Sequence, residues 1–302
     1  MSDATDVIPP RVRLNLRQFD TSRWDHVRLR DDDIIVATWA KTGTTLTQQM
    51  VYQLITGGAE DVASVSISPW VELRYGAPVE RMAEMLESQT HRRVLKTHSP
   101  FEAVPLSESI KYIYVGRDAR DVLWSAYNYV TSFTDAAQKA SDAREGPWPK
   151  RRVPDEDVRT YYLHWLENDN KESFHELSFW DHVQGWWDQR QRPNLLLLHY
   201  ANLIADLTGE MRRLAAFLKI PIDEARLPLQ VERCGIDYMR NKARGTHLDV
   251  TFKEGSASFF HKGTNGRWRD VLSPEESARC DEVAAQRLTP DCAHWLKTGE
   301  IR

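Results

Sequence analysis

Short runs of apolar residues alternate with longer segments of helical periodicity along this chain. The apolar runs that we predict to be strands are residues 34–38, 93–96, 111–115 and 194–199. Apolar residues recur at helical spacing in residues 46–55, 79–87 and 207–218, which we predict to be helices. Strands that are apolar throughout and are separated by helices are typical of a parallel sheet covered on each side. The pattern therefore predicts the α/β class: a single domain with a central parallel sheet flanked by helices on both faces.

The length of the chain is compatible with one large domain. We expect residues 1–302 to form it, because this length lies at the upper end for a single hydrophobic core. Residues 1–30 are polar and mixed, and they are predicted to be an irregular N-terminal segment. Residues 133–157 are polar and contain prolines, which favours a lid, and we predict a lid or acceptor-binding insertion over about 133–175. The Ser-Pro-Glu-Glu at residues 273–276 is a capping box and predicts the start of a further helix.

The strongest candidate for chemistry follows the first predicted strand. Residues 34–38 run into a turn of small and polar residues, Lys41-Thr42-Gly43-Thr44-Thr45, and a helical segment begins at once. A strand, a tight turn and a helix leave the N–H groups of the first helical turn pointing at a ligand, where the helix dipole favours negative charge. Gly43 allows close approach of the backbone, and Lys41 adds a full positive charge. We interpret this segment as a phosphate-binding loop; an ordinary strand-to-helix turn with a solvent-exposed lysine is the alternative.

The order of residues in this loop differs from that of the common P-loop. There the lysine follows the second glycine and precedes a Ser or Thr that binds magnesium, whereas Lys41 precedes Gly43 here. The order favours a related cradle that serves another transfer chemistry without a metal. A nucleotide kinase that uses the Lys41 loop with magnesium stays the alternative enzyme.

Composition and charge restrict the classes of partner and the compartment. The formal net charge of -4 and the sequence pI of about 6.2 provide no general attraction to nucleic acid or to anionic membranes. The three cysteines form no Cys-x-x-Cys pair, and His175 and His182 are too far apart for an adjacent pair on one helix face, so we expect no metal site. We find no secretory signal and no apolar run long enough to span a membrane. We therefore expect a cytoplasmic protein with no nucleic-acid partner and no integral membrane part.

Polar clusters follow three of the predicted strands. They are the Lys41 loop, the segment Lys96-Thr97-His98, and the segment from Arg117 to Ser125. Ligands of open α/β sheets bind beyond the carboxyl ends of the parallel strands. The three clusters are therefore expected to converge on one crevice.

These motifs resemble those of the cytosolic-type sulfotransferases, and the chain looks like a bacterial member. That family moves a sulfuryl group from 3′-phosphoadenosine 5′-phosphosulfate (PAPS) to a hydroxyl or an amine. Residues 38–45 are similar to its 5′-phosphosulfate loop, 96–100 to the segment with its catalytic histidine, and 117–125 to its 3′-phosphate motif. Residues 261–268 are similar to its C-terminal Arg-Lys-Gly-x-x-Gly-x-Trp motif. The four motifs occur in the family's order, and the resemblance extends from about residue 30 to 290.

The resemblance implies a role for each matching residue. His98 would be the general base, Lys41 would stabilise the departing 5′-phosphate, Lys96 would bind the transferring group, and Ser125 would engage Lys41 before the acceptor binds. The residues implied to bind PAPS, the co-substrate, are Lys41, Thr42, Gly43, Thr44, Thr45, Arg117, Ser125, Tyr200, Lys262 and Gly263. No metal is expected. The alternatives are a structural role for His98, a surface ion pair of Arg117 with Asp118 or Asp121, and a core position for Tyr200.

Three positions depart from the family pattern. The family has Trp at the position of Leu46, a Phe-containing segment at Ile236 and Arg at His261. Each change removes a contact to the adenine or to a phosphate of PAPS. A non-catalytic PAPS-binding protein is therefore a further alternative. The family's dimer motif reads differently at residues 269–274, so both a homodimer and a monomer stay open.

The acceptor is predicted from aromatic residues near the clusters. The candidates are Trp70, Tyr75, Phe101, Phe133, Trp148 and the aromatics of residues 161–165. They favour a hydroxyl, or an amine, of a small aromatic, alcohol or lipidic acceptor. The basic run at residues 150–152 is either a solvated lid face or a contact for an acidic acceptor.

Overall fold

The computed structural model describes residues 3, 6–60, 67–143, 146, 153–168 and 176–302. Residue contacts divide the chain into two compact units. Unit 1 comprises Met1–Gly116 and His182–Cys234, and unit 2 comprises Arg117–Asp181 and Gly235–Arg302. The α/β class predicted from the sequence is confirmed, because unit 1 contains a parallel sheet whose strands alternate with helices.

The sheet of unit 1 has four parallel strands in the order β2-β1-β3-β4. They are β1 (Ile34–Thr38), β2 (Val94–Thr97), β3 (Lys111–Gly116) and β4 (Leu195–His199), which agree with the predicted strands to within one residue at each end. The chain passes from β1 to β2 on one side and then to β3 on the other, so the strand order reverses at β1. The carboxyl end of β1 is therefore the topological switch point, where α/β sheets bind their ligands.

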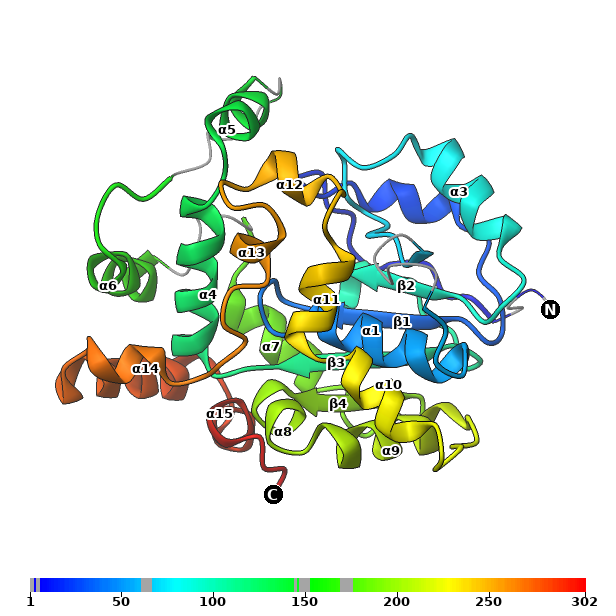
Figure 1. Ribbon diagram of the computed structural model, residues 1–302. Helices are drawn as coiled ribbons and strands as arrows, with labels where there is room; N and C mark the ends of the chain where they lie inside the picture. The colour runs from blue at the N-terminus through cyan, green and yellow to red at the C-terminus, as the bar shows by residue number, and fades with distance from the viewer. Residues whose placement is uncertain (1–2, 4–5, 61–66, 144–145, 147–152, 169–175) are drawn as a thin grey trace. The chain divides into compact units, whose positions relative to one another are not determined.

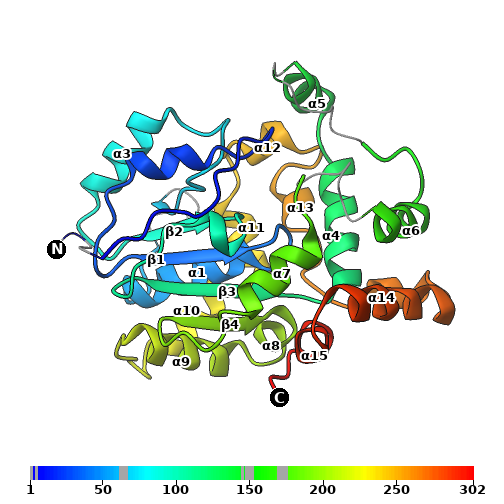
Figure 2. The same cartoon turned by 180° about the vertical axis from the view of Figure 1, so that it is seen from behind.

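Both faces of this sheet are covered, as predicted. On one face Val36 and Val115 pack with residues of α1 (Thr44–Ile55) and α9 (Leu207–Leu218), which present their apolar stripes to the sheet. On the other face Tyr114 stacks on Trp186 of α7 (Phe179–Trp187), with ring centroids 5.2 Å apart and planes at 8°. Figure 1 shows α1 in front of the sheet, and Figure 2 shows α7 across it from behind.

A buried ion pair joins the starts of β1 and β2. Asp33 and Arg93 are fully buried and lie 2.6 Å apart, and Arg93 also donates to the backbone carbonyl of Arg28. The other elements of unit 1 are η1 (Thr21–His26), α3 (Val79–Ser88), η2 (Phe101–Ala103), α8 (Tyr200–Ala205) and α10 (Leu227–Arg233). The described part of residues 1–30 contains one short 3-10 helix and isolated bridges, in keeping with the irregular segment that we predicted.

Unit 2 is helical. Its elements are α4 (Ala119–Thr131), α5 (Asp135–Asp142), α6 (Val158–Asn168), α11 (Ile236–Lys242), α12 (Leu248–Thr251), α13 (Ser256–Phe259), η3 (Arg267–Asp270), α14 (Pro274–Arg287) and α15 (Pro290–Thr298). The predicted capping box begins α14: the Ser273 hydroxyl accepts from the Glu276 N–H at 3.2 Å, and the Ser273 N–H donates to Glu276 Oε2 at 2.9 Å. An aromatic cluster forms a small core in which Phe252 contacts Tyr129, Phe133 and Phe259.

The insertion predicted over 133–175 contains α5 and α6. Residues 144–145, 147–152 and 169–175 lie outside the described residues, as do Trp148, His175 and the basic run at 150–152. The lid therefore stays a prediction. Among the helices that are described, none combines the length and the apolar character needed to cross a bilayer.

Candidate active site

The Lys41 loop connects the carboxyl end of β1 to the N-terminus of α1. Two of its residues have positive backbone φ angles: Lys41 at 70° and Gly43, the N-cap of α1, at 120°. A positive φ at a residue other than glycine is strained and is concentrated at functional sites. The turn brings the first backbone N–H groups of α1, which have no acceptor within the helix, next to a lysine, and this is the arrangement of an anion-binding loop.

Glycine is required at position 43 for space as well as for conformation. A Cβ atom built on Gly43 would lie 2.7 Å from Cδ2 of Tyr200 and 3.6 Å from Cγ1 of Val115. Tyr200, at the start of α8, is buried and belongs to the core cluster of unit 1. Its ring therefore packs directly against the backbone of the loop, and it is both a core residue and a neighbour of the candidate phosphate site.

The hydroxyl groups of the loop have different surroundings. The Thr42 hydroxyl donates to the backbone carbonyl of Trp39 at 2.9 Å, and Thr44 Oγ1 lies 2.7 Å from Thr38 Oγ1. Both side chains are buried, whereas Thr45 is half-buried. Thr42 and Thr44 therefore brace the loop with their side chains, and their backbone N–H groups are the donors that they offer to an anion.

The imidazole of His98 is attached to the same loop. Its Nδ1 lies 2.8 Å from the backbone carbonyl of Thr38 and 3.0 Å from Thr38 Oγ1. A carbonyl oxygen can only accept, so Nδ1 carries the proton and the lone pair of the neutral ring is on Nε2. The hydrogen bonds Thr44–Thr38–His98 thus connect the start of α1 to the ring of His98. The edge of the Trp70 ring approaches that ring at a centroid distance of 4.6 Å.

The backbone of His98 is held by a second histidine. His182 of α7 donates from Nε2 to the carbonyl of His98 at 3.1 Å, and its Nδ1 accepts from the Tyr114 hydroxyl at 3.1 Å. Burial lowers the pKa of His182 to about 3, so its ring is neutral at physiological pH. His182 therefore has a structural role that fixes the position of His98.

Lys96 lies on β2, two residues before His98. Its ammonium is 4.8 Å from the centroid of the Trp70 ring, a cation–π contact. Burial lowers the pKa of Lys96 to about 8, and the carboxylate of Glu72 opposes that shift. Glu72 is fully buried and accepts from the backbone N–H of His98 at 2.6 Å. Sequence reasoning missed Glu72; a lone acid inside the apolar segment of residues 69–73 is the signal that could have found it.

In unit 2, two of the sequence motifs come together. Arg117 is buried, and it donates from Nε to Asn265 Oδ1 at 3.0 Å and from a terminal nitrogen to the Thr264 carbonyl at 3.1 Å. The N–H of Gly266 donates to Asp121 Oδ1 at 2.6 Å. The motif that begins at Arg117 therefore anchors the glycine-containing loop of residues 261–268.

Other predicted residues of unit 2 lie on the same elements. Gly263 and Gly266 have φ angles of 66° and 82°, so this loop also turns sharply. Lys262 is exposed on it, and Ser125 is half-buried on α4. The alternative for Arg117 was a surface ion pair with Asp118 or Asp121. Asp118 lies 2.8 Å from Arg120, whereas Asp121 interacts electrostatically with Arg117, which is buried and not at the surface.

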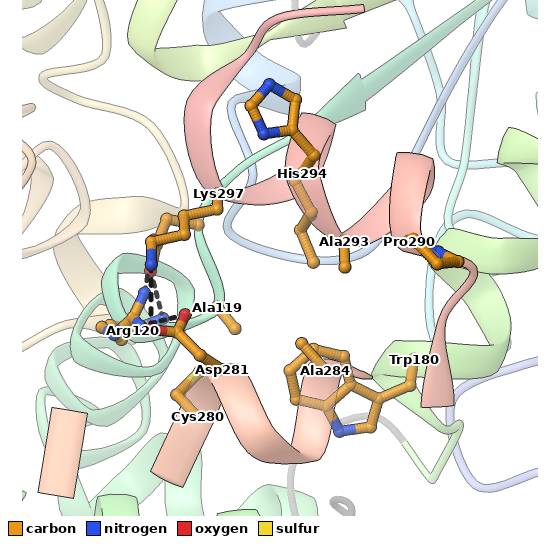
Figure 3. A pocket seen from close by; sticks show the side chains of 12 residues that line it. Ala119, Arg120, Trp180, Cys280, Asp281, Ala284, Pro290, Ala293, His294 and Lys297 are labelled. Atoms are coloured by element: carbon orange, nitrogen blue, oxygen red, sulfur yellow. Dashed lines mark hydrogen bonds and ion pairs between the residues drawn. The ribbon is translucent and has the colours of Figure 1, made fainter. Parts of the chain in front are cut away.

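A small hollow of unit 2 lies beside Arg120, between the start of α4 and helices α14 and α15 (Figure 3). Asp281 pairs with both Arg120 and Lys297 on one side of it, and Trp180 and Ala284 form an apolar side. Because its charged groups pair with one another, they hold the helices together. No group of three or more His, Cys, Asp or Glu side chains in the described parts of the chain is arranged to hold a metal ion.

Known proteins are similar to this chain in sequence. A family model described as a sulfotransferase domain matches residues 31–290. A glycolipid sulfotransferase of Mycobacterium bovis (strain BCG / Pasteur 1173P2) is 30% identical over 306 residues, which cover 93% of this chain and 92% of that protein. Human sulfotransferase 1C2 is 24% identical over 286 residues, with 90% of each chain covered.

Solved structures share the fold. A crystal structure of mouse sulfotransferase SULT7A1 complexed with PAP has a TM-score of 0.69 at 19% identity, and 93% of each chain is covered. A structure of retinol dehydratase in a complex with retinol and PAP has a TM-score of 0.67 at 19% identity, covering 90% of this chain and 87% of that one. The family model covers far more than half of the chain, and the chain therefore belongs to the sulfotransferase domain family.

Proposed function

We propose that this sulfotransferase uses PAPS as the donor and transfers its sulfuryl group to a hydroxyl of a small aromatic, alcohol or lipidic acceptor. The observation that carries the proposal is the hydrogen bond from His98 Nδ1 to the backbone carbonyl of Thr38, at 2.8 Å. Thr38 is the last residue of β1, directly before the Lys41 loop. The imidazole of His98 is thereby held beside a loop that can bind an anion. Transfer from a phosphosulfate to a hydroxyl requires both an anion-binding site and a proton acceptor.

The donor-binding residues fit the charges of PAPS. In unit 1, the backbone N–H groups of Thr42 to Thr45 and the ammonium of Lys41 would bind the 5′-phosphosulfate. Tyr200, packed against Gly43, would contact the adenine. In unit 2, Arg117, Ser125, Lys262 and Gly263 are proposed to bind the 3′-phosphate, as their motifs in the family imply; the exposed ammonium of Lys262 on a sharply turning loop supports this, since a cation attracts a phosphate.

The reaction assigns a task to each group near the loop. The acceptor oxygen forms a bond to sulfur while the bond from sulfur to the bridging oxygen of the 5′-phosphate breaks, and adenosine 3′,5′-bisphosphate (PAP) leaves. His98 takes the acceptor proton on Nε2, the nitrogen that bears the lone pair when Nδ1–H is donated to Thr38. Lys41 stabilises the charge that develops on the bridging oxygen, and Lys96 stabilises the charge of the transferring group. Ser125 is proposed to engage Lys41 in the absence of acceptor.

Among the proposed acceptor classes, a lipidic acceptor is favoured. The relatives that are 30% identical over 93% of this chain carry the name glycolipid sulfotransferase. Trp70 presents an apolar ring next to His98, which suits an acceptor with an apolar body and a hydroxyl. A glycolipid therefore belongs in the acceptor panel beside phenols and alkyl alcohols.

The test is the variant His98→Ala, compared with His26→Ala. His26 is an exposed histidine of the same unit, at the end of η1, so it controls for the loss of an imidazole. Loss of the general base should reduce transfer from radiolabelled PAPS by about 100-fold or more, with PAP affinity within about threefold of the wild type. His26→Ala should retain wild-type turnover. An active His98→Ala variant would refute the mechanism.

A further inference from the structure

One buried carboxylate lies behind both Lys96 and His98. Glu72 belongs to a short segment that runs beside β2: the Lys96 N–H donates to the carbonyl of Pro69 at 2.9 Å, and the Val71 N–H donates to the carbonyl of Lys96 at 3.1 Å. The Glu72 carbonyl also accepts from the Asp20 N–H at 2.9 Å. The backbone of Glu72 is therefore fixed on both sides, and its side chain is fully buried.

This carboxylate accepts hydrogen bonds from residues at the carboxyl end of β2. Glu72 Oε1 accepts from the backbone N–H of His98 at 2.6 Å and from the Thr97 hydroxyl at 2.9 Å. The Thr97 hydroxyl in turn accepts from the Ser99 N–H at 3.0 Å. One side chain thus orders the turn that carries the proposed general base.

The same carboxylate acts on Lys96 through space. Glu72 favours the charged form of Lys96, which burial disfavours. Burial raises the pKa of Glu72 itself, while the His98 N–H, the Trp70 side chain and the Thr97 hydroxyl favour its ionised form. Arg23, on η1, also interacts electrostatically with Glu72. At Glu72, burial favours the neutral acid, and these donors together with the nearby cations oppose that effect.

A buried carboxylate is costly unless it is paired, and an apolar side chain would fill this position at lower cost. Here the partners of Glu72 include two residues with proposed roles in transfer. We propose that Glu72 is a positioning residue, which fixes the backbone of His98 and pairs electrostatically with the ammonium of Lys96. This inference rests on the proposed function and adds to it a residue that does not touch the substrate.

The decisive variant is Glu72→Gln, which keeps the shape and an accepting oxygen but removes the charge. Its matched control is Glu87→Gln, the same substitution on α3 of unit 1, where the carboxylate pairs with Arg93. Four quantities are compared with the wild type: the dissociation constant of PAP, the midpoint of thermal unfolding, and kcat and kcat/KM for radiolabelled PAPS from pH 6 to 9.5.

The wild-type profile should decline as the pH rises through about 8, where Lys96 loses its proton. Removing a neighbouring negative charge lowers the pKa of an ammonium further, so the alkaline limb of Glu72→Gln should move to lower pH by about one unit. We expect kcat at pH 7.5 to fall by about tenfold or more, with KM and PAP affinity within about threefold of the wild type. Glu87→Gln should leave the limb where it is.

A second variant guards against loss of folding. Glu72→Asp keeps the charge but is shorter by one methylene, so it should lower kcat while its alkaline limb stays at the wild-type pH. A residue that only stabilises the fold would change the unfolding midpoint and leave both the limb and kcat unchanged.

The outcomes separate this inference from the proposed function. A wild-type protein that neither binds PAP nor transfers sulfuryl from PAPS would refute the proposed function. A wild-type protein that transfers, with a folded Glu72→Gln variant whose kcat and alkaline limb are unchanged, would overturn only the role of Glu72. If Glu72→Gln does not fold, the Glu72→Asp variant decides: a kcat equal to that of the wild type would overturn the role of Glu72.

Discussion

Replacing Gly43 by Ala tests how the loop is built. The residue has a φ of 120°, and its missing side chain leaves room for the ring of Tyr200. An added Cβ would lie 2.7 Å from Tyr200 Cδ2 and 3.4 Å from Cε2, so either the ring or the loop must move. The ring is buried among residues of the core and has little space to do so.

The expected loss of stability has two parts. Holding a residue other than glycine at this φ costs about 1–3 kcal/mol. Overpacking against a buried ring costs about another 1–3 kcal/mol. The sum is about 2–6 kcal/mol. This is a large share of the free energy of unfolding of native proteins, which is about 5–15 kcal/mol.

Urea unfolding followed by fluorescence measures this loss. Gly245→Ala is the matched control, because Gly245 also has a positive φ, of 75°, and no atom lies within 4 Å of its added Cβ. Its cost should therefore be the backbone part alone, about 1–2 kcal/mol. The difference between the two variants combines the clash with Tyr200 and the larger backbone cost of a φ of 120°.

A double-mutant cycle with Tyr200→Leu tests whether the ring of Tyr200 causes the loss of stability. If the ring causes the clash, the double variant Gly43→Ala, Tyr200→Leu should be more stable than the sum of the single effects by about 1–2 kcal/mol. Additive effects, or a Gly43→Ala variant no less stable than Gly245→Ala, would refute the close packing of Tyr200 on the loop.

Two further predictions concern unit 2. Arg117→Lys keeps the charge but loses the fork that reaches Asn265 and Thr264, so PAP affinity should fall by about 10-fold in calorimetry, and unchanged affinity would remove Arg117 from the proposed 3′-phosphate site. Ser273→Ala removes the hydroxyl that caps α14 and should cost about 1 kcal/mol in urea unfolding without a change in PAP affinity, whereas an unchanged stability would deny the capping box its role.

The regular elements of the chain were predictable where burial decides them. The bounds of β1 and α9 agree with the prediction residue for residue, because continuous apolar runs and strong helical periodicity leave few alternatives. Helix α5 was not predicted, since Asp135–Asp142 is polar and its neighbourhood is typical of a loop. The short helices α10 to α13 were also not predicted, because segments of four to seven residues show no clear period.

The sequence predicts residues for the candidate site, but it does not predict the hydrogen bonds among them. The motifs identified the Lys41 loop and His98, because each follows a predicted strand. That the hydroxyls of Thr42 and Thr44 point to the backbone and to Thr38 depends on the conformation of the turn, which propensities do not determine. The contact of Glu72 with His98 joins residues 26 apart through the pairing beside β2, so it becomes visible only in three dimensions.

The most direct test of the account is a calorimetric titration of the wild-type protein with PAP in EDTA, with ATP and magnesium as the comparison. It requires no knowledge of the acceptor. The account predicts tight binding of PAP without a metal and no comparable binding of ATP with magnesium. No binding of PAP, together with binding of ATP and magnesium, would contradict the account and assign the Lys41 loop to a nucleotide kinase.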